Sequence, residues 1–147
     1  MKKGINFIGV GSGSIIFNNE RKVFVAQKGP NARNEAGKWD FPGGSVEFGE
    51  TCEDAVVREL NEEFEIDIEV IELLEVVNHI IPKEQQHWVS PSFIAKHIRG
   101  NPRITEPDKC IGFKWMKMSE INPNELSEAS NSNYYKFIEK YGEEKIF

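Results

Sequence analysis

The segment from Thr51 to Phe64 constrains the fold more than any other, because its residues suit only one type of secondary structure. Its apolar residues Val56, Leu60 and Phe64 recur at every fourth position, which is the spacing of one face of an α-helix. Thr51 precedes this pattern, and its hydroxyl can accept hydrogen bonds from the free amides of a first helical turn. We therefore expect a helix that begins at Thr51 and packs its apolar stripe on a sheet.

The same helix is crowded with acidic side chains. Glu59, Glu62 and Glu63 lie at positions i, i+3 and i+4, so their carboxylates share one face, away from the apolar stripe. Like charges at this spacing repel each other, and the adjacent Arg58 cannot neutralise three carboxylates. An acidic triplet alone is more often a solvated surface. Hard divalent cations such as Mg²⁺ take carboxylate oxygens as ligands and usually bring substrate phosphates with them, so we infer that a cation binds here.

The residues before the helix extend this pattern into a known motif. From Trp39 to Glu50 the chain reads W-D-F-P-G-G-S-V-E-F-G-E. Together with the helix it resembles the Nudix hydrolase family, MutT-like members in particular, whose box is G-x5-E-x7-R-E-U-x-E-E-x-G-U with U aliphatic. The residues that match are Gly44, Glu50, Arg58, Glu59, Leu60, Glu62, Glu63 and Ile66.

One position of the box departs from the family. Glu65 stands where the family has its second glycine, so the glycine that usually ends such a helix in a left-handed conformation is absent. If Glu65 takes that conformation the cost is about 1 kcal/mol; otherwise the helix ends in another way.

The resemblance implies a metal site and a cofactor. In the family, the box glutamates bind Mg²⁺ or Mn²⁺, which gives Glu59, Glu62 and Glu63 the role of metal ligands and catalytic residues. A backbone carbonyl at the glycine turn joins them, and Gly43 is the matching position. A glycine suits this role because the backbone can approach an ion with no side chain in the way.

The resemblance also implies supporting residues. Gly44, Glu50 and Arg58 would hold the site together, the last two as an ion pair between the loop and the helix. The general base is open: it is Glu59, acting on the attacking water, or an acid outside the box. Glu106, in the loop before the last predicted strand, is the first such candidate, although an ordinary loop acid is the more common explanation.

Basic residues flank the glycine turn. Lys28, Arg33 and Lys38 are positioned along the chain to meet phosphate oxygens, although exposed lysines and arginines are common. The three histidines have no recognisable spacing, and we assign them no role.

Composition limits the class of protein. The 147 residues suit a single domain, 1–147, and they contain no run of eighteen apolar residues that would cross a membrane. We expect a cytoplasmic protein with no membrane partner. The net charge of −6 argues against a nucleic-acid polymer as partner, which leaves a small nucleotide. Whether the protein forms a homodimer is open.

The order of predicted elements gives the fold class. Strands are expected at 5–17, 22–28, 66–70, 73–81, 86–98 and 112–118, and a second helix at 133–141. Strands flanking two helices favour an α/β fold, a three-layer α/β/α sandwich with a central mixed sheet. The Nudix resemblance implies the same architecture.

The function that follows is a metal-dependent pyrophosphohydrolase. Its substrate would be a nucleoside diphosphate linked to another group, foremost a nucleoside or deoxynucleoside triphosphate, as in clearing damaged nucleotides from the pool. An ADP-ribose or nucleotide-sugar pyrophosphatase is the alternative within the class, and Pro82 lies where many ADP-ribose-cleaving members carry a proline. A non-catalytic, nucleotide-sensing Nudix module is the alternative of another class. An RNA cap-removing enzyme would use the same box, but the acidic balance of the chain disfavours it.

Overall fold

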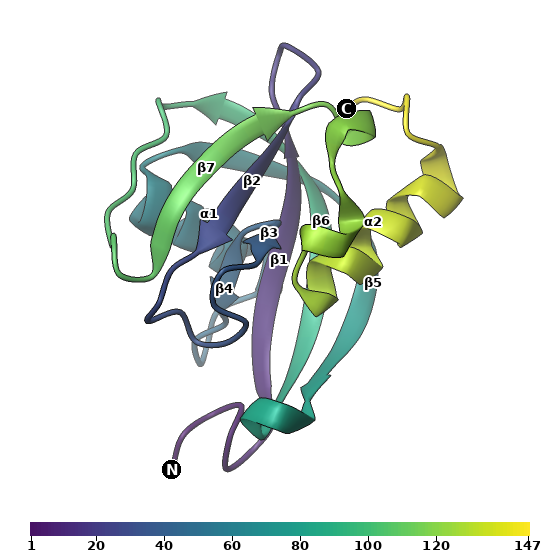
Figure 1. The fold of residues 1–147 in the computed structure, drawn as a ribbon. Helices are drawn as coiled ribbons and strands as arrows, with labels where there is room; N and C mark the ends of the chain where they lie inside the picture. Colours follow the sequence, from purple (N-terminus) through teal and green to yellow (C-terminus); the bar gives the residue numbers. More distant parts are fainter.

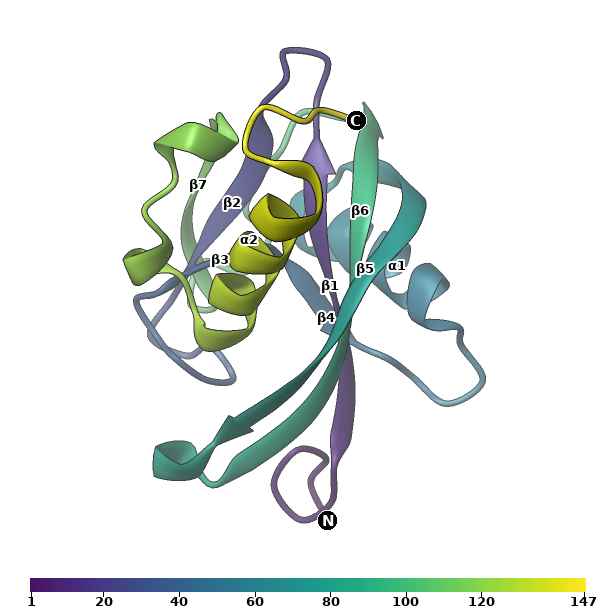
Figure 2. The ribbon, with the colours of Figure 1, turned by 90° about the vertical axis from the view of Figure 1, so that its right-hand side faces the viewer.

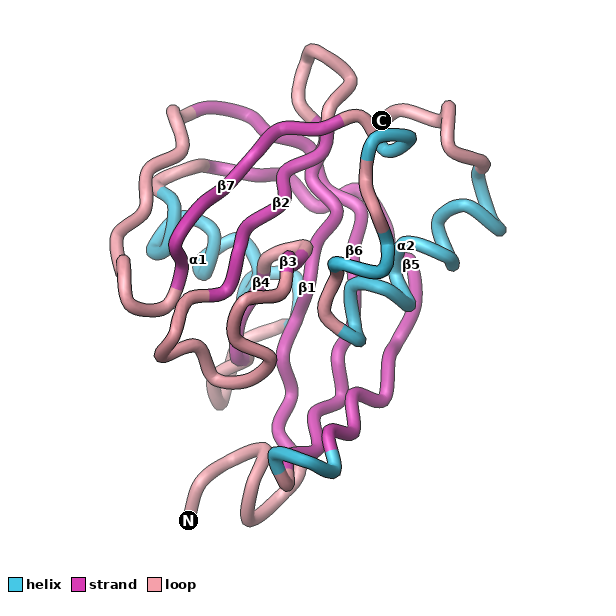
Figure 3. Tube along the Cα trace, in the orientation of Figure 1, coloured by secondary structure: helices cyan, strands magenta, loops and turns pink.

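The computed structural model describes all 147 residues, with strands in magenta and helices in cyan in Figure 3. The elements, in chain order, are β1 (Gly9–Phe17), β2 (Val23–Lys28), β3 (Trp39–Asp40), β4 (Gly43–Ser45), α1 (Cys52–Phe64), β5 (Asp67–Ile81), η1 (Pro82–Glu84), β6 (Gln86–Arg99), β7 (Cys110–Met116), η2 (Met118–Glu120), η3 (Pro123–Glu125) and α2 (Glu128–Tyr141). No helix is long and apolar enough to cross a bilayer.

The strands form one mixed sheet. Its order is β3-β2-β1-β6-β5, with β4 pairing β1 and β7 pairing β2. The β1–β6 pair is parallel, whereas β5 pairs β6 and β7 pairs β2 in antiparallel fashion. The long β5–β6 hairpin extends below the body of the molecule, close to the N-terminus (Figures 1 and 2).

The two helices cover opposite faces of the sheet (Figure 2). Side chains alternate across a strand, so neighbouring residues of β1 serve different cores. Ile15 lies in the core that contains Phe137 of α2, and Ile16 lies in the core that contains Leu60 of α1. The architecture is therefore the predicted α/β/α sandwich with a central mixed sheet.

Helix α1 begins and ends through specific backbone contacts. The Thr51 hydroxyl accepts a hydrogen bond from the Asp54 amide at 3.0 Å, as the sequence predicts. The predicted apolar stripe is buried together with Ala55. The helix ends at Glu65, which takes the left-handed conformation with φ 58° and donates its amide to the Asn61 carbonyl. The chain thus keeps the family's helix end without the family's glycine.

Several element bounds differ from the sequence prediction. Residues 5–8 are not part of β1, because the chain turns at Gly4, whose φ is +81°. Strand β5 runs without a break from Asp67 to Ile81, and irregularities in its register take the place of the gap predicted between two strands. Strand β7 begins and ends two residues earlier than predicted.

The second helix begins at Glu128, five residues before the predicted start. Its first turns bury Ser130 and Asn133, which are polar, so hydrophobic periodicity does not reveal them.

Candidate active site

The glycine turn lies directly against helix α1. Strand β4 carries this turn and pairs with β1, with Gly44 opposite Ser12. A Cβ atom at Gly44 would lie 2.2 Å from the carboxyl carbon of Glu59, and one at Gly43 would lie 1.8 Å from the Ser12 carbonyl oxygen. Gly43 therefore has no room for a side chain against the backbone of β1, and the absence of a side chain at Gly44 leaves the space that the Glu59 carboxylate occupies.

The three glutamates of α1 differ in their surroundings. The Glu59 side chain is 15% exposed, and that of Glu62 is 59% exposed. Burial raises the pKa of Glu63 to about 8, and the charge of the neighbouring Glu59 adds to the increase. The carboxylates of Glu59 and Glu63 thus repel each other in a sheltered position, while that of Glu62 is largely exposed to solvent.

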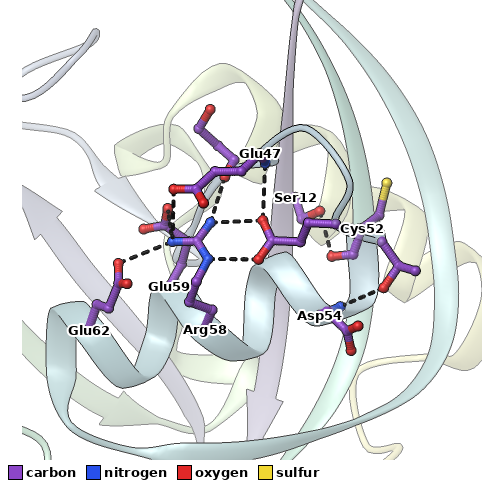
Figure 4. Close-up of polar contacts among 10 residues, drawn as sticks. Ser12, Glu47, Cys52, Asp54, Arg58, Glu59 and Glu62 are labelled. Atoms are coloured by element: carbon purple, nitrogen blue, oxygen red, sulfur yellow. Dashed lines mark hydrogen bonds and ion pairs between the residues drawn. The ribbon is translucent and has the colours of Figure 1, made fainter.

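Arg58 binds several of these acids at once (Figure 4). Its guanidinium donates to both oxygens of Glu50, at 2.7 and 2.9 Å, and to the Ser45 carbonyl at 3.0 Å. Its Nη1 donates to Glu59 and to Glu62, each at 3.1 Å. The hydrogen bonds from Arg58 hold the pKa of Glu50 at about 2, well below its ordinary value. The loop before α1 is therefore tied to the helix by a bidentate ion pair.

The donor set suits a hard divalent cation. Glu59 and Glu63 supply closely spaced carboxylate oxygens, and no protein cation contacts Glu63. No group of three or more acidic, histidine or cysteine side chains is gathered closely enough to hold a metal, and Glu62 accepts a hydrogen bond from Arg58. A cation between Glu59 and Glu63 would remove the repulsion that burial aggravates. These residues therefore fit a metal, with Glu62 as a ligand only after it leaves Arg58.

A cavity of about 540 Å³ opens beside these glutamates. It brings together most of the residues that the sequence singles out. The predicted residues that line it are Lys28, Arg33, Gly43, Gly44, Glu59, Glu62, Glu63 and Glu106. Lys38 is exposed and does not line it, although the sequence placed it with Lys28 and Arg33. Glu50 and Arg58 do not line the cavity.

The structure also places unpredicted residues at the cavity. Asp40 accepts hydrogen bonds from the hydroxyls of Ser127 and Ser130, at 3.0 and 2.6 Å, which joins the strand before the glycine turn to α2. His79 is buried, and its Nε2 lies 2.8 Å from a carboxylate oxygen of Glu35. These partners are far apart in the chain, so no local motif signals them. The W-D-F-P run that precedes the glycines is the only hint of Asp40.

The chain is similar to known proteins in both sequence and fold. The model of the NUDIX domain matches residues 8–141. An 8-oxo-dGTP diphosphatase of Escherichia coli is 31% identical over 116 residues, which cover 79% of this chain and 85% of that protein. An 8-oxo-dGTP diphosphatase of Proteus vulgaris is 43% identical over 68 residues, which cover 46% of this chain and only 60% of that protein. Among solved structures, a MutT NUDIX hydrolase from Burkholderia pseudomallei superposes with a TM-score of 0.78 at 32% identity, covering 88% of this chain and 97% of that one.

Proposed function

Since this chain belongs to the Nudix family and is a hydrolase of diphosphate bonds, we propose that it cleaves nucleoside triphosphates, oxidised ones included, to a nucleoside monophosphate and pyrophosphate. The observation that carries this proposal is its similarity to the 8-oxo-dGTP diphosphatase of Escherichia coli along 85% of that protein. The acid-lined cavity beside the glycine turn supports it, because its volume of about 540 Å³ lies within the range of small-molecule sites.

We propose Mg²⁺ or Mn²⁺ as the cofactor. Glu59 and Glu63 would hold the cation, Glu62 would join them, and the Gly43 carbonyl would complete the protein ligands. When bound, the cation neutralises the phosphate oxygens and makes the attacking water a better nucleophile. Gly44 takes part by leaving room for the Glu59 carboxylate, where any side chain would collide with it.

The general base has two candidates at the cavity. Glu59 is sheltered and adjacent to the site where the water would attack, whereas Glu106 reaches the cavity from the loop before β7. Glu106 is 50% exposed and pairs with Lys109 at 3.6 Å, whereas Glu59 is 15% exposed and accepts a hydrogen bond from Arg58 at 3.1 Å. Each carboxylate thus has a basic partner, and we favour Glu59 because it is the more sheltered of the two.

Two basic residues are suited to hold phosphates. Lys28 and Arg33 line the same cavity as the acids. Lys28 donates to the Asn34 side chain at 2.6 Å, which leaves two of its three protons for a ligand. Arg33 is exposed along part of its length, and the charges of Glu59 and Glu63 act on its guanidinium. A substrate phosphate between this guanidinium and a cation would be held from both sides.

We propose that residues 1–147 work as one domain in the cytoplasm, and that the partner is a small nucleotide rather than a nucleic-acid polymer. The net charge of −6 supports the last point, because a polymer site needs a basic surface. The mass of the protein in solution would show whether it forms a homodimer.

A substrate panel tests the proposal. The pure protein with Mg²⁺ is incubated with dGTP, 8-oxo-dGTP, ADP-ribose, a dinucleoside polyphosphate and a nucleotide sugar, and the products are separated. We expect a monophosphate and pyrophosphate from at least one triphosphate, at a kcat/KM above that for the other classes. Preferential release of AMP and ribose phosphate from ADP-ribose would replace the proposal with the alternative inside the family. Binding of nucleotide with no product from any substrate would point to a sensing module.

A further inference from the structure

Arg33 is a cation without a partner in an acidic cavity. Its guanidinium takes part in none of the ion pairs of the structure, although the charges of Glu59 and Glu63 act on it. Burial lowers the pKa of Arg33, and these carboxylates act in the opposite direction. The N–H donors at the edge of the guanidinium are therefore free for a ligand, whereas those of Arg58 are already in use.

The indole ring of Trp88 stacks on the guanidinium of Arg33. The guanidinium carbon of Arg33 lies 4.1 Å from the centre of the Trp88 ring. Trp88 is only 4% exposed and lies on β6, far from Arg33 in sequence. Stacking on an indole engages the flat face of a guanidinium and leaves its edges available for hydrogen bonds.

A single glutamine fixes both members of the stack. The Trp88 indole N–H donates to Oε1 of Gln86 at 2.8 Å, and Nε2 of Gln86 donates to the Arg33 carbonyl at 2.8 Å. The side chain of Asn34 also donates to the same Gln86 oxygen, at 3.2 Å. The ring and the backbone that carries the cation are thus held by one buried residue, so their relative position is set by the fold.

The indole has no room to move away from Arg33. A Cβ atom at Gly4 would lie 2.3 Å from the indole, and one at Gly9 would lie 2.4 Å from it. The backbone at these two glycines therefore packs directly on the ring. Gly4 needs its freedom for a second reason, because its φ of +81° is one that other residues rarely adopt.

We propose that Trp88 is a positioning residue, which holds the Arg33 guanidinium flat so that its free N–H edge meets the phosphate oxygens of the substrate. This inference rests on the proposed function, because the phosphates belong to the nucleotide. Trp88 acts only through Arg33. A tryptophan that merely filled the core would support stability but would have no specific link to that cation.

A double-mutant cycle separates the two roles. Arg33→Ala, Trp88→Leu and the double variant are compared with the parent by kcat and KM on the best triphosphate of the panel. We expect Arg33→Ala to lower kcat/KM by about tenfold to a hundredfold, as for loss of hydrogen bonds to a charged group. Trp88→Leu should lower kcat/KM by about threefold to tenfold. The loss should appear in whichever of kcat and KM the Arg33→Ala substitution changes. In the Arg33→Ala background, Trp88→Leu should change kcat/KM by less than about twofold.

Chemical rescue gives a readout that a mere loss of stability cannot produce. Guanidinium chloride, at a concentration far below the one that unfolds the protein, should restore part of the activity of Arg33→Ala, because the free ion can stack on Trp88. The double variant should not respond. Lys114→Ala is the matched control, since Lys114 lies over Trp39 at 4.8 Å in a similar stack, and neither residue lines the cavity. It should retain parental kinetics and show no rescue.

The cycle is run in parallel with Trp88→Phe, which keeps an aromatic face in a smaller volume, and thermal unfolding is followed for every variant. The Phe variant decides the question if Leu is not tolerated, and it should lose less activity than Leu where both fold. Additive effects of the two substitutions, or equal rescue in the presence and absence of Trp88, would overturn the positioning role. Failure of the parent on all triphosphates would instead overturn the proposed function.

Discussion

Two regions of the molecule contribute residues to the cavity, and their arginines have different surroundings. In the glycine turn and α1, Arg58 is bound by Glu50, Glu59 and Glu62. In the loop 29–38 and β6, Arg33 stacks on Trp88 and makes no ion pair. An arginine whose N–H donors are bound by carboxylates holds the protein together. An arginine that only stacks on an aromatic ring keeps its N–H donors free for a ligand. One region thus carries the acids and their support, and the other carries the free positive charge.

The largest expected effect tests the acidic region. Glu63→Gln should lower kcat at least about a hundredfold, because a carboxylate proposed to hold the catalytic cation is lost. Glu62→Gln should also lower it by orders of magnitude, although Glu62 begins on Arg58. Neither should destabilise the metal-free protein much, since burial and the Glu59 charge already disfavour the ionised form of Glu63, and the Glu62 side chain is 59% exposed. Steady-state kinetics with Mg²⁺ and thermal unfolding without it measure both expectations.

The matched control for these variants lies on the same helix. Glu53 is exposed in the first turn of α1 and does not line the cavity, so Glu53→Gln should keep the parental rate. Parental turnover by both Glu62→Gln and Glu63→Gln would show that the acids of α1 are not the metal site.

The contrast between the regions also explains what the sequence can predict. Glu50 and Arg58 are eight residues apart, and the acids of α1 are closer still, so a linear motif carries their geometry. Gln86 and Arg33 are 53 residues apart, and Asn34 and Gln86 are 52 apart. Such contacts depend on which strands become neighbours in the sheet, which local patterns do not specify. Composition and periodicity therefore predict the sandwich and the helix, but not the support of Arg33.

Lys28 and Lys38 show the same limit within one loop. Both flank the glycine turn in sequence, yet only Lys28 lines the cavity, because the chain doubles back between them and turns Lys38 outward.

The second prediction uses this pair of lysines. Lys28→Ala should raise KM for a triphosphate by about tenfold, as expected for a lost hydrogen bond between charged groups. Lys38→Ala should change it by less than about twofold, because an exposed charge outside the cavity is screened. An equal or larger effect of Lys38→Ala would mean that the substrate reaches beyond this cavity, and the division between the two regions would fail.

The third prediction tests the ion pair that supports the acidic region. Hydrogen bonds from Arg58 lower the pKa of Glu50 from 4.5 to about 2, so the folded protein binds this proton less readily than the unfolded chain. The stabilisation is therefore present above about pH 4.5 and is lost as the pH falls toward 2. Glu50→Gln should lower Tm at pH 7, and the difference from the parent should shrink through that window.

A surface pair provides the comparison for Glu50. Glu20 is 77% exposed and lies 3.9 Å from Lys22, so Glu20→Gln should leave Tm nearly unchanged at every pH. A difference between parent and Glu50→Gln that persisted undiminished at pH 2 would show that the carboxylate contributes by packing rather than by charge.

The smallest effect concerns the end of α1. Glu65 adopts a left-handed conformation that glycine takes without strain, but it also lies 3.3 Å from Arg103 in an exposed pair. Glu65→Ala removes only the pair and should cost a few tenths of a kcal/mol. Glu65→Gly removes the pair and the Cβ atom, and should exceed the alanine variant in unfolding free energy by about 1 kcal/mol. Denaturant unfolding of the two variants isolates the backbone term, because the lost ion pair is common to both. A glycine variant no more stable than the alanine variant would mean that residue 65 is not held in the left-handed region, and that the family's helix end is not reproduced in this chain.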